Sequence, residues 1–199
     1  PILIYCDHGH KSQDMVKVFG KRGFTNCFSL DGGFDVWYQK INAPKQPLSE
    51  LVCAWLSEHG FDPTNLDARS WNNETALICA ARKGNYNLCA ELLAAGASVD
   101  AKNKDGNNAL WMACLSNSQK ITDLLIEYDI DVDNQNDNGA TALIHAASNG
   151  KTKLVKNLVF AGANVYLATL DDFTAIHVAS NREILNFLRA QVMPLAQVG

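Results

Sequence analysis

The chain has 199 residues, of which 47% are hydrophobic and 19% are charged, and its formal net charge is -4. This composition is typical of a globular protein with room for one or two domains, and it excludes a disordered or fibrous chain. Every apolar run falls far short of the roughly 18 residues that a transmembrane helix needs, so we expect a soluble, cytoplasmic protein with no membrane contact.

Charge is divided unevenly along the chain. Residues 1–45 hold six Lys and Arg against four Asp and Glu, whereas residues 46–199 hold eleven against seventeen. An acidic second part is a poor match for nucleic acid, so we expect no nucleic-acid partner. The sequence opens with Pro1 rather than Met, which leaves open a removed signal or an upstream segment.

Six cysteines are scattered without a CxxC pair. This spacing favours free thiols in a reducing compartment and argues against both a disulfide framework and a zinc site. We expect no metal, and we expect buried structural thiols at five of the six positions: Cys27, Cys53, Cys79, Cys89 and Cys114.

The first 43 residues alternate between strand and helix patterns. "PILIY" predicts a short buried strand, and "SQDMVKVFGKRGF" predicts a helix with Met15, Val18 and Phe19 on one face before Gly23 ends it. "TNCFSL" predicts a second strand and "DGGFDVWYQK" a second helix. This order predicts an α/β sheet with a functional loop at the end of a strand.

The loop after the first predicted strand has the chemistry of an activated thiol. Cys6 leaves the strand toward a helix N-terminus, where unpaired N–H groups favour the thiolate. Lys11, with His8 and His10 near it in sequence, adds positive potential, and Gly9 lets the backbone curl around the sulfur. The two histidines shape the electrostatics of the loop rather than bind a metal.

Two motifs in this region carry a resemblance to a known family. "CDHGHKS" resembles the rhodanese active-site pattern C-x-x-G-x-[RK]-S, and "SLDGGFDVW" resembles the ending of the same family. The resemblance implies a thiosulfate sulfurtransferase that needs no cofactor, with Cys6 as the nucleophile that accepts sulfur from thiosulfate or a persulfide donor. It also implies a loop that cradles the substrate, formed by Asp7, His8, Gly9, His10, Lys11 and Ser12.

A phosphatase is the competing reading of a cysteine loop. Related phosphatases place an arginine six positions after the cysteine, to grip a phosphate ester with both guanidinium nitrogens. This chain has Ser12 there. Sulfur transfer is therefore the better interpretation.

The resemblance covers only the C-terminal part of such a domain, residues 1–43. A segment of about 40 residues cannot bury a stable core alone. Two hypotheses follow: an enzyme that is active when a longer parent protein supplies the upstream half, or a non-catalytic binding module that carries an inactive rhodanese remnant.

A repeat organises the rest of the chain. After a linker at residues 44–47, similar heptapeptides begin 33 residues apart, at Thr75, Asn108, Thr141 and Thr174. Each opening predicts a short first helix, and a leucine-rich second helix such as "NLCAELLAAG" follows. Residues that tolerate a left-handed backbone then stop the second helix, at Gly96, Asp129 and Gly162.

This pattern resembles the ankyrin repeat, with its "TPLHxAA" opening and its "GAxVxxxNxxG" turn. Alanine replaces the usual proline at four positions, and the histidine after "TPL" survives only as His177. We read residues 48–199 as an opening half-repeat capped by Ser49, three full repeats, and an atypical last repeat whose two helices lie about one turn closer. The predicted fold is thus an α/β rhodanese-like C-terminal half followed by an all-α ankyrin-repeat solenoid.

Three residues are candidates for protein binding by the array. The resemblance implies that Trp111 and Met112 line a concave face that binds a protein partner, and Trp71 falls at the hairpin-tip position of Lys104 and Asp137. Packing at the capped end of the array is an equal alternative for Trp71. We expect His145 and His177 to be structural.

Overall fold

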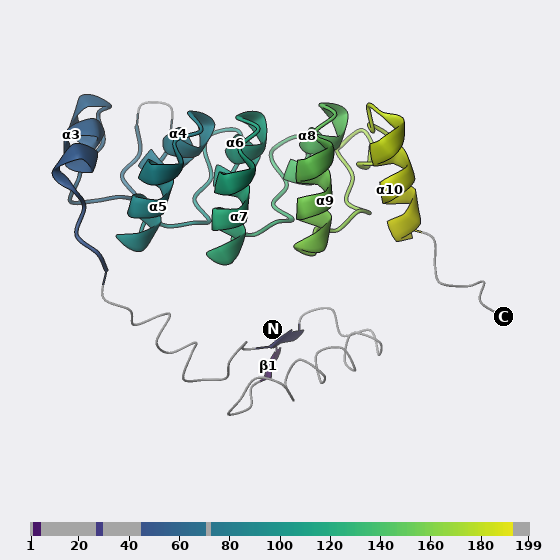
Figure 1. Ribbon diagram of the computed structural model, residues 1–199, viewed down its shortest axis with the longest axis horizontal. Coiled ribbons are helices and arrows are strands. Elements are labelled where there is room, and N and C mark those ends of the chain that lie inside the picture. Colours follow the sequence, from purple (N-terminus) through teal and green to yellow (C-terminus); the bar gives the residue numbers. More distant parts are fainter. Residues whose placement is uncertain (1, 5–26, 30–44, 71–72, 193–199) are drawn as a thin grey trace. The chain divides into compact units, whose positions relative to one another are not determined.

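The computed structural model describes residues 2–4, 27–29, 45–70 and 73–192. The chain divides into two compact units, residues 1–45 and 46–199, whose elements are drawn in Figure 1. The predicted cysteine loop and the two predicted helices of the first unit lie outside the described residues, as does Trp71.

The described part of the first unit is a pair of strands. Strand β1 (Ile2–Ile4) and strand β2 (Cys27–Ser29) pair in parallel, with Leu3 opposite Phe28. Both strands lie inside the segments predicted for them. A parallel pair requires a crossover connection, which agrees with an α/β arrangement. The remainder of the rhodanese-like fold stays a prediction.

The second unit is a row of antiparallel helix pairs. Figure 1 shows the first helix of each pair in one layer and the second helix in another, with successive pairs side by side. A single helix opens the row and a single helix closes it. The helices are α3 (Glu50–Glu58), α4 (Ala76–Arg82), α5 (Tyr86–Ala94), α6 (Ala109–Leu115), α7 (Gln119–Glu127), α8 (Ala142–Ser148), α9 (Thr152–Phe160) and α10 (Arg182–Val192).

Side-chain caps fix where the first helices begin. Thr75 Oγ1, Asn108 Oδ1 and Thr141 Oγ1 accept hydrogen bonds from the backbone N–H three residues on, at 3.4, 3.1 and 3.2 Å. Each bond satisfies a donor that the helix itself leaves unpaired. The predicted cap Ser49 does the same for α3, since its hydroxyl accepts from the Val52 N–H at 3.3 Å. The recurring heptapeptides are therefore helix starts.

The core runs along the row between the two layers. The first helices are buried almost throughout, and their alanines, among them Ala80, Ala113 and Ala146, are fully buried where neighbouring first helices touch. The second helices bury one face only, with Leu92 and Leu158 as fully buried members. Each buried leucine contributes about 1.5–3 kcal/mol to folding.

The end of the row differs from the prediction. The sequence predicts an atypical last repeat with two helices about one turn closer together, but residues 175–178 form only a turn before α10 begins at Arg182. Helix α10 begins eight positions after Thr174, whereas α9 begins eleven positions after Thr141. The shorter stretch leaves no room for two helical turns and a reversal, so the loss falls on the first helix itself.

The left-handed stops lie where they were predicted. Gly96, Asp129 and Gly162 have φ values of 92°, 60° and 95°. Together with the row of helix pairs, these stops confirm the predicted ankyrin-like solenoid.

Among the described residues, every helix is too short or too polar to span a bilayer.

Candidate functional site

The chain carries two candidate sites, one in each unit. In the first unit, Cys6 follows the end of β1 by two residues, but the loop from Asp7 to Ser12 lies outside the described residues. The parallel pairing of β1 and β2 is the described feature that bears on it. The role of the loop therefore remains a proposal from sequence.

In the second unit, Trp111 on α6 is the aromatic residue that sequence singled out on the first-helix layer. Its side chain is partly exposed, and its ring centroid lies 4.6 Å from that of His145 on α8. The pKa of His145 is lowered, first because the ring is buried and second because Lys151 is positively charged. His145 thus presents a neutral ring to Trp111, and the two side chains join neighbouring repeats.

Met112 does not belong to this surface. Its side chain is only 5% exposed and is part of the hydrophobic core. Successive residues on a helix point about 100° apart, so Met112 turns inward where Trp111 reaches the surface. Met112 is therefore not accessible to a partner as expected, and partner binding by Trp111 stays a prediction.

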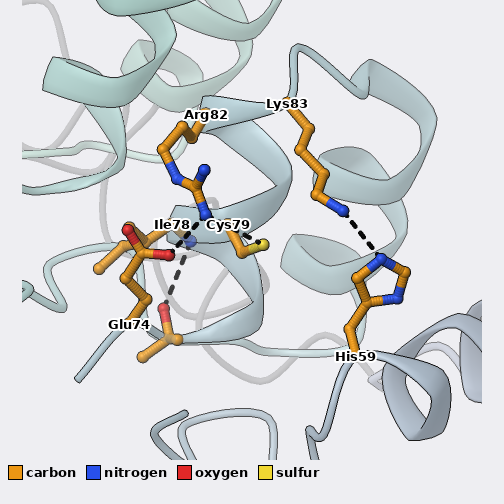
Figure 2. Close-up of polar contacts among 7 residues, drawn as sticks. His59, Glu74, Ile78, Cys79, Arg82 and Lys83 are labelled. Atoms are coloured by element: carbon orange, nitrogen blue, oxygen red, sulfur yellow. Dashed lines mark hydrogen bonds and ion pairs between the residues drawn. The ribbon is translucent and has the colours of Figure 1, made fainter. Parts of the chain in front are cut away.

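A polar cluster lies on the first full repeat and was not anticipated. Figure 2 shows Arg82 between Glu74 and Cys79. Arg82 Nη2 donates to Glu74 Oε2 at 3.0 Å and lies 3.8 Å from Cys79 Sγ. Burial raises the pKa of Cys79, and the positive charges of Arg82 and Lys83 offset this only in part. Cys79 is therefore a thiol rather than a thiolate nucleophile.

A second contact in Figure 2 joins the opening helix to the first full repeat. Lys83 Nζ lies 2.8 Å from His59 Nε2 and 5.4 Å from the centroid of the Trp55 ring. The Trp55 and His59 rings stack at 4.1 Å, and His59 Nδ1 is 2.9 Å from the Trp55 carbonyl oxygen. These contacts hold α3 in place as the end of the row, so they are structural rather than a site.

Two further described thiols, Cys89 and Cys114, are inert by burial, whereas Cys53 is half-buried rather than buried as predicted. Burial raises the pKa of both Cys89 and Cys114 to about 12. Within the described ranges, Cys53, Cys79, Cys89 and Cys114 are free thiols, and acidic, cysteine and histidine side chains form no group of three suited to a metal ion.

Comparisons with known proteins match the two units of the chain to two different families. The family description "Ankyrin repeats (3 copies)" matches residues 42–136 and 130–193, and "Rhodanese-like domain" matches residues 1–40. The B-cell lymphoma 3 protein homolog of Mus musculus is 32% identical over 128 residues, which is 64% of this chain and 29% of that protein.

The N-terminal stretch matches bacterial sulfurtransferases. Thiosulfate sulfurtransferase GlpE of Stutzerimonas stutzeri is 43% identical over 37 residues, 19% of this chain and 34% of that protein. GlpE of Pseudomonas aeruginosa matches equally well. This chain thus spans about a third of the length of the curated relatives that it matches.

Among solved structures, the ankyrin repeat domain of Bcl-3, described as a unique member of the IkappaB protein family, superimposes with a TM-score of 0.60 at 32% identity. The match covers 63% of this chain and 55% of that chain. The two ankyrin-repeat matches together cover all of residues 42–193, which include every helix from α3 to α10. The chain therefore belongs to the ankyrin-repeat family and carries a rhodanese-like segment at its N-terminal end.

Proposed function

We propose that this chain is a protein-binding ankyrin array joined to a sulfur-transfer segment, and that the array selects or docks the protein on which the segment acts. The observation that carries the binding role is Trp111. It is the aromatic side chain on the first-helix layer that stays partly exposed, although it packs on His145 across a repeat boundary. A rigid aromatic ring that packs on the array and keeps part of its surface in solvent is well suited to anchor a partner.

The test of the binding role is a partner captured by the full chain, identified, purified and titrated against the Trp111→Ala variant. We expect a loss of affinity of about ten-fold or more, since truncated hot-spot residues cost upward of about 2 kcal/mol. Leu51→Ala is the matched control, because Leu51 is 84% exposed and lies on α3 at the far end of the row. Equal affinities for wild type and Trp111→Ala would remove this face from the proposal.

The sulfur-transfer role is supported by the loop "CDHGHKS", within a stretch that is 43% identical to GlpE. In this proposal the Cys6 thiolate attacks the outer sulfur of thiosulfate, the sulfur–sulfur bond breaks, and sulfite leaves with the electron pair. A cyanide or thiolate acceptor then attacks the outer sulfur of the Cys6 persulfide, which releases thiocyanate or a new persulfide and restores the thiolate. The backbone N–H groups of the loop and Lys11 stabilise the anions in transit.

The test of this role follows thiocyanate formation from thiosulfate and cyanide by the full-length parent protein. Cys6→Ser should abolish turnover and should also prevent the addition of one sulfur atom that mass spectrometry detects after thiosulfate treatment. Cys27→Ser is the matched control, since Cys27 lies in the adjoining strand β2 rather than in the loop. Persistent turnover in Cys6→Ser would end the catalytic proposal.

A non-catalytic role is the second candidate. In that case the rhodanese-like segment is a scaffold remnant and the array alone acts. Retention of cysteine, glycine, lysine and serine at their motif positions argues against it, and absence of thiocyanate formation by the parent protein would favour it.

A further inference from the structure

The last hairpin of the array exposes two large apolar side chains where the two preceding repeats carry polar or small residues. Leu170 is 77% exposed and Phe173 is 51% exposed. In the two preceding repeats, the position of Leu170 is occupied by Asp137 and Lys104. The position of Phe173 is occupied by Ala140 and Asn107. The fold therefore does not require apolar groups at these two positions.

The hairpin that carries them is held rigidly. The Leu170 N–H donates to the Asn138 carbonyl of the preceding hairpin at 3.0 Å, and the Thr169 N–H donates to the Phe173 carbonyl at 3.0 Å. Asp172 completes the turn with a φ of 62°. The Phe173 and His177 rings pack edge to face, with centroids 6.5 Å apart. The two apolar groups are thus preorganised on a fixed turn rather than loosely placed, which lowers the entropy cost of binding.

Their surroundings are acidic. Asp171 and Asp172 lie between them in sequence and are exposed, and Asp137 is exposed on the adjoining hairpin. Neither of the two ion pairs between described residues involves these carboxylates. Residues 129–150 and 161–181 contain no Lys or Arg. We define the last-hairpin patch as Asp137, Leu170, Asp171, Asp172 and Phe173.

The hairpins become more acidic along the row. Those nearer α3 expose Arg69, Lys102 and Lys104 together with the carboxylates of Asp67, Asp100 and Asp105, whereas those nearer α10 expose carboxylates without any Lys or Arg. A cationic partner segment is therefore attracted most strongly to the end of the row nearer α10.

We propose that the last-hairpin patch binds a lysine- or arginine-rich segment of a partner protein, with a large apolar side chain of that segment seated against Leu170 and Phe173. This inference rests on the proposed protein-binding role of the array and adds the chemistry of the ligand. The exposed apolar pair supplies the contact area, and the surrounding carboxylates select cations and repel acidic sequences. An acidic or uncharged partner finds no complementary charge here.

The test uses the full chain and a fluorescent peptide of about twelve residues, the length of an extended recognition segment, with four arginines and two leucines in a serine background. One comparison peptide has both leucines replaced by serine, and another has the arginines replaced by glutamate. We expect the basic, leucine-containing peptide to bind, the serine version to bind about ten-fold more weakly, and the glutamate version not to bind.

Variants of the chain locate the site. Leu170→Ser and Phe173→Ser should each weaken binding by about ten-fold, because each exposed side chain loses its apolar contact with the peptide. The double variant Asp171→Asn, Asp172→Asn should weaken binding less than either apolar variant does. Its affinity should also depend less on salt concentration, because the two carboxylates whose attraction salt would screen are gone. Asparagine tolerates the positive φ of position 172, so this pair should fold normally. Leu51→Ser, at the other end of the row, is the control and should bind as wild type does.

Panning a random peptide library against the full chain separates this inference from the proposed function. Enrichment of basic peptides that require Leu170 and Phe173 supports the inference. Enrichment of acidic or neutral peptides that require Trp111 overturns the inference and leaves the protein-binding role intact. Binding of the basic peptide that the Leu170 and Phe173 variants do not weaken overturns the patch, and absence of any enriched ligand overturns both proposals.

Discussion

Asp100 accepts a hydrogen bond through Oδ1 from the backbone N–H of Asp131, which lies 3.2 Å away in the next repeat. The same bond recurs one repeat earlier, from Ser98 N–H to Asp67 at 2.8 Å, and one repeat later, from Asn164 N–H to Asp133 at 2.7 Å. The three acceptors are spaced by 33 residues. Each carboxylate thus fastens one repeat to the next, and together they form a ladder along one edge of the row.

Removing one rung of this ladder should weaken the joint between two repeats. We expect Asp100→Ala to lower the free energy of unfolding by about 1 kcal/mol, because the Asp131 N–H loses its protein acceptor on an exposed edge where water partly replaces it. Urea denaturation followed by circular dichroism measures the change. Asp100→Asn keeps an acceptor oxygen and should cost less, so an equal loss in both variants would contradict the hydrogen-bond explanation.

Gly106 should tolerate a side chain far less than Gly162 does. Both have positive φ values, 77° and 95°, so alanine at either position costs about 1–2 kcal/mol of backbone strain. A Cβ at Gly106 would also lie 2.7 Å from Asp137 Oδ1 and 3.0 Å from the Asp137 backbone nitrogen, whereas at Gly162 nothing lies within 4 Å. We therefore expect a clearly larger loss of stability in Gly106→Ala, measured by urea denaturation. Equal losses would show that close packing of the hairpins adds nothing.

The repeat was readable from sequence because each unit solves the same packing problem. The heptapeptide starts at Thr75, Asn108 and Thr141 and the left-handed stop Asp129 depend on local residue preferences, so sequence located them, and the structure adds that the first three cap their helices. A shortened last repeat was predicted, but the shortening falls on its first helix rather than between the two helices. There the opening "TAIHVAS" still has a helix-start pattern, but the shortened stretch to α10 decides the structure.

The candidate surface was less predictable. The contact of Trp111 with His145 joins residues 34 positions apart, and which of Trp111 and Met112 faces outward depends on helix phase against two neighbours. The exposure of Leu170 and Phe173 could have been predicted from sequence, because the same positions of the preceding repeat hold Asp137 and Ala140. The ion pair of Glu74 with Arg82 had no comparable signal, since both residue types are common on surfaces. Predictions for Cys6 and its loop remain untested because they lie outside the described residues.

The titration of His145 should separate burial from charge. Because its pKa is lowered in the folded chain, the unfolded state binds more protons below about pH 6.5, and His145 makes stability fall as pH decreases. Burial is the larger cause, and the Trp111 ring covers the imidazole. Trp111→Ala should therefore raise the pKa of His145 more than Lys151→Gln does, as measured by NMR of the imidazole. A full return to the ordinary value in Lys151→Gln alone would show that charge, not burial, is the main cause.

The buried thiols should make the array sensitive to alkali. An unfolded cysteine loses its proton near pH 8.5, whereas burial holds the pKa of Cys89 and Cys114 at about 12 in the folded chain. Between these pH values the unfolded state binds fewer protons, so the free energy of unfolding falls as pH rises, by up to about 1.4 kcal/mol per pH unit for each thiol.

Urea denaturation at about pH 7.5 and at about pH 10 tests this, with the double variant Cys89→Ala and Cys114→Ala. The variant should be less stable at the lower pH because of the cavities, but it should lose less stability on going to the higher pH. Leu92→Ala is the matched control, since it also leaves a cavity in α5 but keeps both thiols and should keep the full pH dependence. An unchanged pH dependence in the double variant would mean that these thiols do not set the alkaline limit of the fold.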